Sequence, residues 1–85
     1  MPYELAFSEE ALNNLKKLEN QMVKRILDRI EEASKNPAHF FERLAGREEY
    51  KLRIGDYRLL AKILQNEEKI FIFSIEHRKK VYKNK

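Results

Sequence analysis

The 85-residue sequence contains no cysteine, so it can form neither disulfide bonds nor thiolate metal sites. Its only glycines are Gly46 and Gly55, which excludes a glycine-rich loop that cradles phosphate. We find no signal-peptide pattern, and the longest apolar run, Ile70–Phe73, is far too short to span a bilayer. These absences lead us to expect a soluble cytoplasmic protein.

Motifs for metal binding and nucleophilic catalysis are also missing. His39 and His77 lie far apart, and neither has a second histidine or a carboxylate at ligand spacing. Ser74 is not part of a Gly-x-Ser-x-Gly elbow. We therefore expect no metal and no cofactor. The length predicts a single domain over residues 1–85 with one small core.

Two apolar stripes at helical spacing predict a helical hairpin in the first half of the chain. Ser8 is a suitable N-cap for the first helix, and a short strand, Tyr3–Phe7, precedes it. The first stripe consists of Leu15 and Leu18 with either Ala11 or Leu12. The second stripe contains Val23, Ile26, Leu27, Ile30 and Ala33. The second helix should end at Asn36-Pro37.

The second half of the chain shows the alternation of apolar and polar residues that is typical of β-strands. Residues 38–48 are expected to be irregular, and strands are predicted over Tyr50–Ile54, Tyr57–Leu64 and Lys69–Ile75. Gly55-Asp56 predicts a two-residue hairpin turn of type II′. The resulting order, β-α-α-β-β-β, predicts an α+β fold with a helical hairpin packed on one face of a mostly antiparallel sheet. A short basic C-terminal tail follows.

Positive charge is concentrated in this second half. Residues 1–46 carry seven Lys or Arg and eight Asp or Glu, whereas residues 47–85 carry eleven and six. A basic asymmetry of this kind favours a polyanion as partner. A solubilising surface is the simpler alternative, because 38% of all residues are charged.

The predicted hairpin gathers several cations on one face of the sheet. A two-residue turn sets Arg53 opposite Arg58, and alternation then places Lys51 and Lys62 on the same face. Two opposed arginines repel each other, which a fold tolerates more readily if the face binds an anion. Protection of an edge strand by charge explains the pattern equally well. The tail would add Arg78, Lys79, Lys80 and Tyr82.

With these segments the chain resembles the RelE/ParE superfamily of toxin–antitoxin toxins, most closely its RelE branch. The resemblance covers nearly the whole chain and is most specific in YKLRIGDYR, residues 50–58, followed by HRKKVY, residues 77–82. It implies that the first strand lies beside the last. It also implies a cognate RelB-like antitoxin and the ribosome with its mRNA as partners.

The RelE branch cleaves mRNA on the ribosome without a metal ion, and the resemblance implies this activity here. By position it assigns catalytic roles to Lys51, Arg58, Arg78 and Tyr82. Together with the charge pattern, the candidate RNA-binding residues are Lys51, Arg53, Arg58, Lys62, Arg78, Lys79 and Lys80. Attack of a ribose 2′-hydroxyl on its phosphate needs a base, an acid and positive charge at the phosphorane.

Two departures from the RelE pattern, at Glu49 and in the short spacing between Arg78 and Tyr82, leave the identity of the general base open. Glu49 stands where some RelE proteins carry a second lysine. The alternative functions are a ParE-like inhibitor of DNA gyrase, a catalytically impaired toxin homologue, and a basic binding module without toxicity. The ParE branch shares the fold but generally lacks the residues for cleavage.

Overall fold

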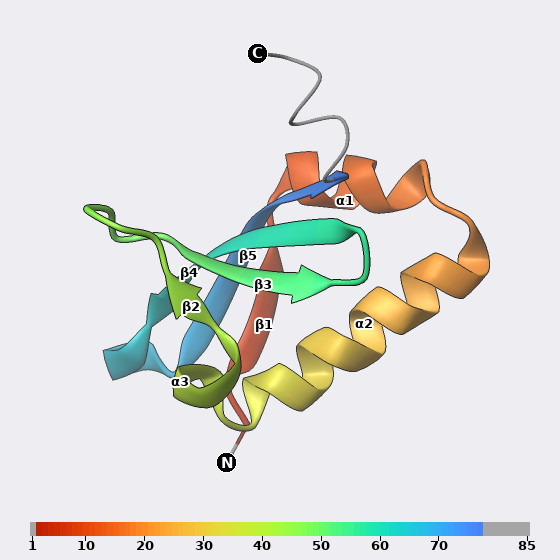
Figure 1. The fold of residues 1–85 in the computed structure, drawn as a ribbon. Coiled ribbons are helices and arrows are strands. Elements are labelled where there is room, and N and C mark those ends of the chain that lie inside the picture. Colours follow the sequence, from red (N-terminus) through yellow and green to blue (C-terminus); the bar gives the residue numbers. More distant parts are fainter. Residues whose placement is uncertain (1, 78–85) are drawn as a thin grey trace.

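The computed structural model describes residues 2–77, in which helices pack against one curved sheet (Figure 1). The elements in chain order are β1 (Glu4–Phe7), α1 (Glu9–Lys16), α2 (Asn20–Ser34), α3 (Pro37–Phe40), β2 (Glu42–Arg43), β3 (Tyr50–Ile54), β4 (Tyr57–Leu64) and β5 (Lys69–His77). A single 3-10 turn, Gln65–Glu67, joins the last two strands. The predicted α+β fold is thereby confirmed.

The five strands form one sheet in the order β1-β5-β4-β3-β2. Strand β1 runs parallel to β5, and all other pairs are antiparallel. The apolar strand β5 therefore lies inside the sheet, and the first strand lies beside the last, as the resemblance implied. Both ends of the sheet are closed by short strands of two to four residues, β2 and β1.

The β3–β4 hairpin has the predicted register. Ile54 pairs with Tyr57 and Arg53 pairs with Arg58 across the two-residue turn. Gly55 has a φ of +59°, whereas Asp56 is not among the residues with positive φ. These are the φ signs that a type II′ turn requires, and they explain why glycine stands first.

Helix α1 is tied to strand β5 by its N-cap residue, Ser8. The hydroxyl of Ser8 accepts a hydrogen bond from the backbone N–H of Ala11 at 3.0 Å, as an N-cap does. The same hydroxyl donates to the carbonyl of Phe73 at 3.0 Å. Because β1 ends one residue earlier, the chain turns directly from the sheet into the helix.

The core lies between the helices and one face of the sheet. The fully buried large side chains include Ile26 and Ile30 of α2, together with Leu59, Ile70 and Ile72 from the strands. Burying such side chains removes apolar surface from water, which is the main favourable term in folding. The opposite face of β3 and β4 is left with the charged side chains of the alternating pattern.

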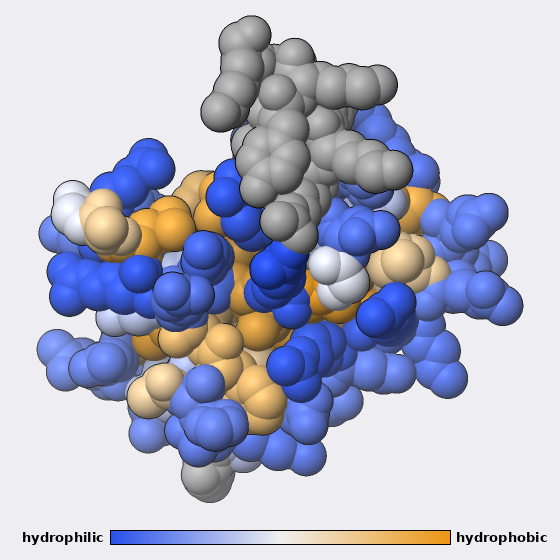
Figure 2. Space-filling view, viewed as in Figure 1, coloured by the Kyte–Doolittle hydropathy of each residue, from blue (hydrophilic) through white to orange (hydrophobic). Residues whose placement is uncertain are grey.

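The two helical stripes were predicted correctly except at two leucines. Ala11 is fully buried while Leu12 is 46% exposed, so the stripe of α1 runs through Ala11. Leu27 was expected in the stripe of α2 but is 40% exposed. Figure 2 shows apolar side chains between the hydrophilic ones that cover most of this view.

The prediction of an irregular segment over residues 38–48 was wrong in part. Pro37 opens the short helix α3 because its fixed φ suits the first helical position. Phe41 is buried in the core and leads into β2, which pairs with Tyr50 and Lys51 of β3. In the part of the chain described, no helix is long and apolar enough to cross a membrane.

Candidate functional site

Two rows of paired residues cross the sheet on the face opposite the core, and most of their side chains are charged. The first row pairs Arg53 of β3 with Arg58 of β4, and Arg58 with Glu76 of β5. The second row crosses all four antiparallel strands and consists of Glu42, Lys51, Leu60 and Ser74. We call these seven residues the charged face.

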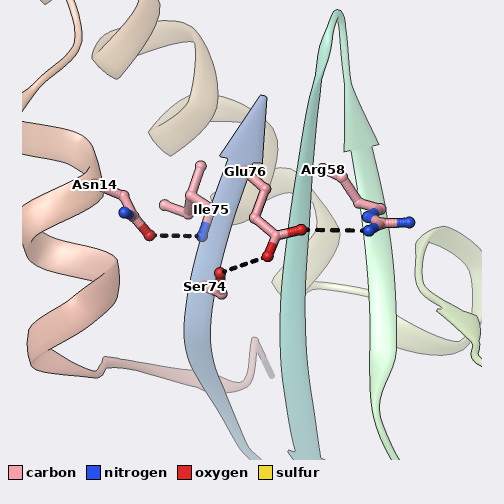
Figure 3. Close-up of polar contacts among 5 residues, drawn as sticks. All are labelled: Asn14, Arg58, Ser74, Ile75 and Glu76. Carbon is pink, nitrogen blue, oxygen red and sulfur yellow. Dashed lines mark hydrogen bonds and ion pairs between the residues drawn. The ribbon is translucent and has the colours of Figure 1, made fainter. Parts of the chain in front are cut away.

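Arg58 lies at the centre of the charged face, between a like charge and an opposite one. Its Nη2 lies 3.3 Å from Oε1 of Glu76, while Oε2 of Glu76 is 3.5 Å from the hydroxyl of Ser74 (Figure 3). The side chains of Arg58 and Glu76 are 37% and 38% exposed. The Nε of Arg58 is buried and has no hydrogen-bond partner. This Nε does not face solvent, but the guanidinium makes no side-chain hydrogen bond other than that of Nη2 within the described residues, so donors remain on its Nη nitrogens.

A β-bulge in β5 brings Glu76 to Arg58. Ala61 pairs with Ile72, but Leu60 pairs with Ser74, so Phe73 is an extra residue in the ladder. An unbroken register would set Glu76 opposite Tyr57, whose neighbours along β4 put it on the core side. The single inserted residue thus moves a carboxylate from the core face to the charged face.

The other two cations of the charged face differ from Arg58. Nζ of Lys51 lies 3.9 Å from Oε1 of Glu42, a loose contact between side chains that are 36% and 75% exposed. Arg53 has no ion pair with any described carboxylate. It lines an open cavity of about 640 Å³ at the end of β3, where α2 contributes cations such as Lys24 and also the carboxylates of Asp28 and Glu32. Of the three cations, Arg53 alone has no carboxylate within ion-pair distance among the described residues.

The end of β5 is fixed on its other side by helix α1. The backbone N–H of Ile75 donates to Oδ1 of Asn14 at 3.0 Å. Strand β1 pairs with β5 only as far as Phe7 and Ile72, so the amide of Asn14 satisfies a donor beyond the reach of β1. Figure 3 shows Asn14 and Arg58 on opposite sides of this strand end.

The structure brings together four of the residues predicted for the site. Lys51, Arg53 and Arg58 lie on the charged face, and Lys62 lies on the same side further along β4. The other predicted residues, Arg78, Lys79, Lys80 and Tyr82, lie outside the described residues. Within residues 2–77, no three His, Asp or Glu side chains are grouped so that they could hold a metal ion.

Sequence reasoning missed the acids of the site. Glu42 was in the segment expected to be irregular, and Glu76 reaches Arg58 only because of the bulge. The available signal was weak, since Glu76 is the one acid after Ile75 in the sequence. The charged face is therefore a mixture of three cations and two carboxylates, instead of the purely cationic surface expected.

Solved structures similar to this chain are toxins and toxin–antitoxin complexes. A chain of the RelBE toxin–antitoxin complex from Mycobacterium tuberculosis is 25% identical, with a TM-score of 0.82 over 92% of this chain and 100% of that chain. The isolated E. coli RelE toxin is 26% identical, with a TM-score of 0.76 over 96% and 93%. The E. coli RelBE complex is 26% identical, with a TM-score of 0.74 over 88% and 95%. No curated protein matched in the sequence comparison.

Sheet order, helix placement and these matches define a RelE-like toxin of a toxin–antitoxin system. The family model of the ParE toxin of type II toxin–antitoxin systems, parDE, matches residues 5–82. The chain belongs to this family, within the RelE/ParE superfamily.

Proposed function

We propose that this toxin is an endoribonuclease that cuts mRNA in the ribosomal A site, and that residues 1–85 form a single toxin domain. The observation that carries the proposal is the pairing of Arg53 with Arg58 across β3 and β4, with Lys51 on the same face. Two guanidinium groups and an ammonium group suit a phosphodiester, because arginine can donate two parallel hydrogen bonds to phosphate.

The proposed reaction is attack of the ribose 2′-oxygen on the adjacent phosphate, without a metal ion, which forms a 2′,3′-cyclic phosphate and breaks the bond to the 5′-oxygen of the next nucleotide. Arg58 and Arg53 hold the phosphate and stabilise the charge that builds up on its oxygens. Of Lys51 and Tyr82, one takes the proton of the 2′-hydroxyl and the other donates a proton to the departing 5′-oxygen, while Arg78 adds positive charge at the phosphorane. The ribosome supplies the orientation of the message, which a surface of side chains alone provides poorly.

The proposal includes a RelB-like antitoxin that neutralises the toxin. Two of the similar structures are complexes of a toxin with its antitoxin, from M. tuberculosis and E. coli. An extended partner with acidic and apolar side chains would complement the basic second half of this chain. A pull-down with the product of a small neighbouring gene tests this, and a toxin that stays monomeric and active in its presence contradicts it.

A ParE-like block of DNA gyrase is the second candidate. The family model favours it, because that model describes the toxin of parDE. The carboxylates of Glu42 and Glu76 favour gyrase inhibition as well. They form ion pairs with Lys51 and Arg58, two cations that an RNase would use to bind phosphate.

Expression of the toxin in growing cells separates the two candidates. An RNase of this type stops translation, and primer extension on a defined message maps cuts to A-site codons. A gyrase inhibitor stops replication and leaves the message intact. Whole messages in arrested cells would overturn the proposed function.

A further inference from the structure

Glu76 contacts the guanidinium of Arg58 through one carboxylate oxygen. Its Oε1 lies 3.3 Å from Nη2, on the face that the proposed function assigns to RNA. A carboxylate oxygen and a phosphate oxygen are equivalent acceptors for a guanidinium group. The contact also offsets part of the repulsion between Arg53 and Arg58.

The contact is of a kind that a stronger acceptor can replace. A single nitrogen–oxygen pair joins the two groups, and 3.3 Å is longer than the 2.7–2.9 Å typical of charge-assisted hydrogen bonds. Both side chains are more than a third exposed, so solvent screens the attraction. The guanidinium of Arg58 makes no other hydrogen bond within the described residues, so donors remain on its Nη nitrogens.

The backbone that carries Glu76 is fixed, whereas its carboxylate is only lightly held. Asn14 binds the N–H of Ile75, and the bulge at Phe73 sets the register on the β4 side. The hydroxyl of Ser74 is at the limit of hydrogen-bond distance, 3.5 Å from Oε2. Release of Arg58 therefore requires only rotation of the Glu76 side chain into solvent.

We propose that Glu76 is a displaceable internal anion that holds Arg58 until a phosphate of the RNA replaces it. This inference rests on the proposed function, since it concerns the same anion site. The competition lowers the affinity of the toxin for RNA phosphates in general. A substrate must then bring further contacts, such as those of a message positioned on the ribosome, to displace the carboxylate.

The test is binding of a fluorescein-labelled single-stranded RNA to the full-length toxin over a series of salt concentrations. Glu76→Gln keeps the shape of the side chain and removes its charge. We expect about two- to fivefold tighter binding, the range set by an exposed ion pair. The slope of log affinity against log salt should change by less than the roughly 0.7 of one full phosphate contact, because Arg58 contacts phosphate in both proteins.

Glu67→Gln is the matched control. It makes the same change in net charge on the exposed turn after β4, at the opposite end of that strand from Arg58. Screening at 0.1 M salt confines its effect to about 10 Å, so it should leave binding almost unchanged. Glu76→Ser serves as a second variant, and thermal unfolding shows whether each variant is folded.

The double variant Arg58→Ala/Glu76→Gln shows whether Glu76 acts through Arg58. We expect it to bind RNA as weakly as Arg58→Ala alone. If both Glu76 variants are folded and bind no tighter than Glu67→Gln, or more weakly than the unmodified toxin, the inference is wrong. If Arg58→Ala itself binds like the unmodified toxin, the anion site of the proposed function fails with it.

Discussion

Arg58 shows how much of a site can be predicted from local sequence. Its partner Arg53 follows from a two-residue turn and the alternation of strands, and both were predicted correctly. Its second partner, Glu76, depends on a bulge that inserts Phe73 into the β5 ladder. A bulge shifts register by one residue and is fixed by long-range packing, so pattern alone places Glu76 on the wrong face.

At the same scale, Arg58→Ala should lower the rate of mRNA cleavage about 100-fold, because one preorganised donor to the transition state is lost. The free energy of unfolding should change by less than about 1 kcal/mol, since an exposed ion pair contributes little. Cleavage on programmed ribosomes and urea unfolding measure the two effects.

Arg47→Ala is the control for this prediction. Arg47 contacts Glu49 at the same 3.3 Å, but in an exposed loop away from the charged face. The Arg47→Ala toxin should cleave mRNA at the same rate as the unmodified toxin. Equal losses in both variants would point to net charge instead of the position of Arg58.

Strand β5 shows what an element requires beyond its own sequence. Its apolar residues predicted a strand inside the sheet, which the order β1-β5-β4 confirms. The strand extends to His77, two residues past the predicted end. Its end is fixed by Ser8 and Asn14, which lie more than 60 residues away in the sequence. Such contacts carry no local signal, so neither the extension nor its supports could be predicted.

At the element scale, Asn14→Ala should destabilise the fold by about 1–3 kcal/mol, because the N–H of Ile75 loses its acceptor. The loss should be local, with faster hydrogen exchange at Ile75 than at Ile72. Asn13→Ala is the matched control, since Asn13 is the exposed neighbour on α1. If hydrogen exchange at the N–H of Ile75 is equally fast in both variants, Asn14 does not stabilise the end of β5.

The whole molecule is small, and its stability depends on few buried side chains. Twelve hydrophobic residues form the buried core in the part of the chain described. Patterning predicted most of them, but not the choice of Ala11 over Leu12, which depends on how α1 packs against β5. In a domain of this size, one or two such side chains are a large share of the net stability.

At this scale, Ile72→Ala should cost about 2–5 kcal/mol, because the cavity lies at the centre of the core. The matched variant Ile63→Ala, at a half-buried position of β4, should cost clearly less. Urea unfolding of both variants gives the comparison. Equal costs would mean that the core is not centred on β5.

The most direct test of the account is cleavage by purified toxin on ribosomes programmed with a message of known A-site codon. Primer extension should show a cut within that codon with the toxin and none when ribosomes are omitted. In a parallel reaction, supercoiling by DNA gyrase should be unaffected. An uncut message together with blocked supercoiling would contradict the account and identify a gyrase inhibitor.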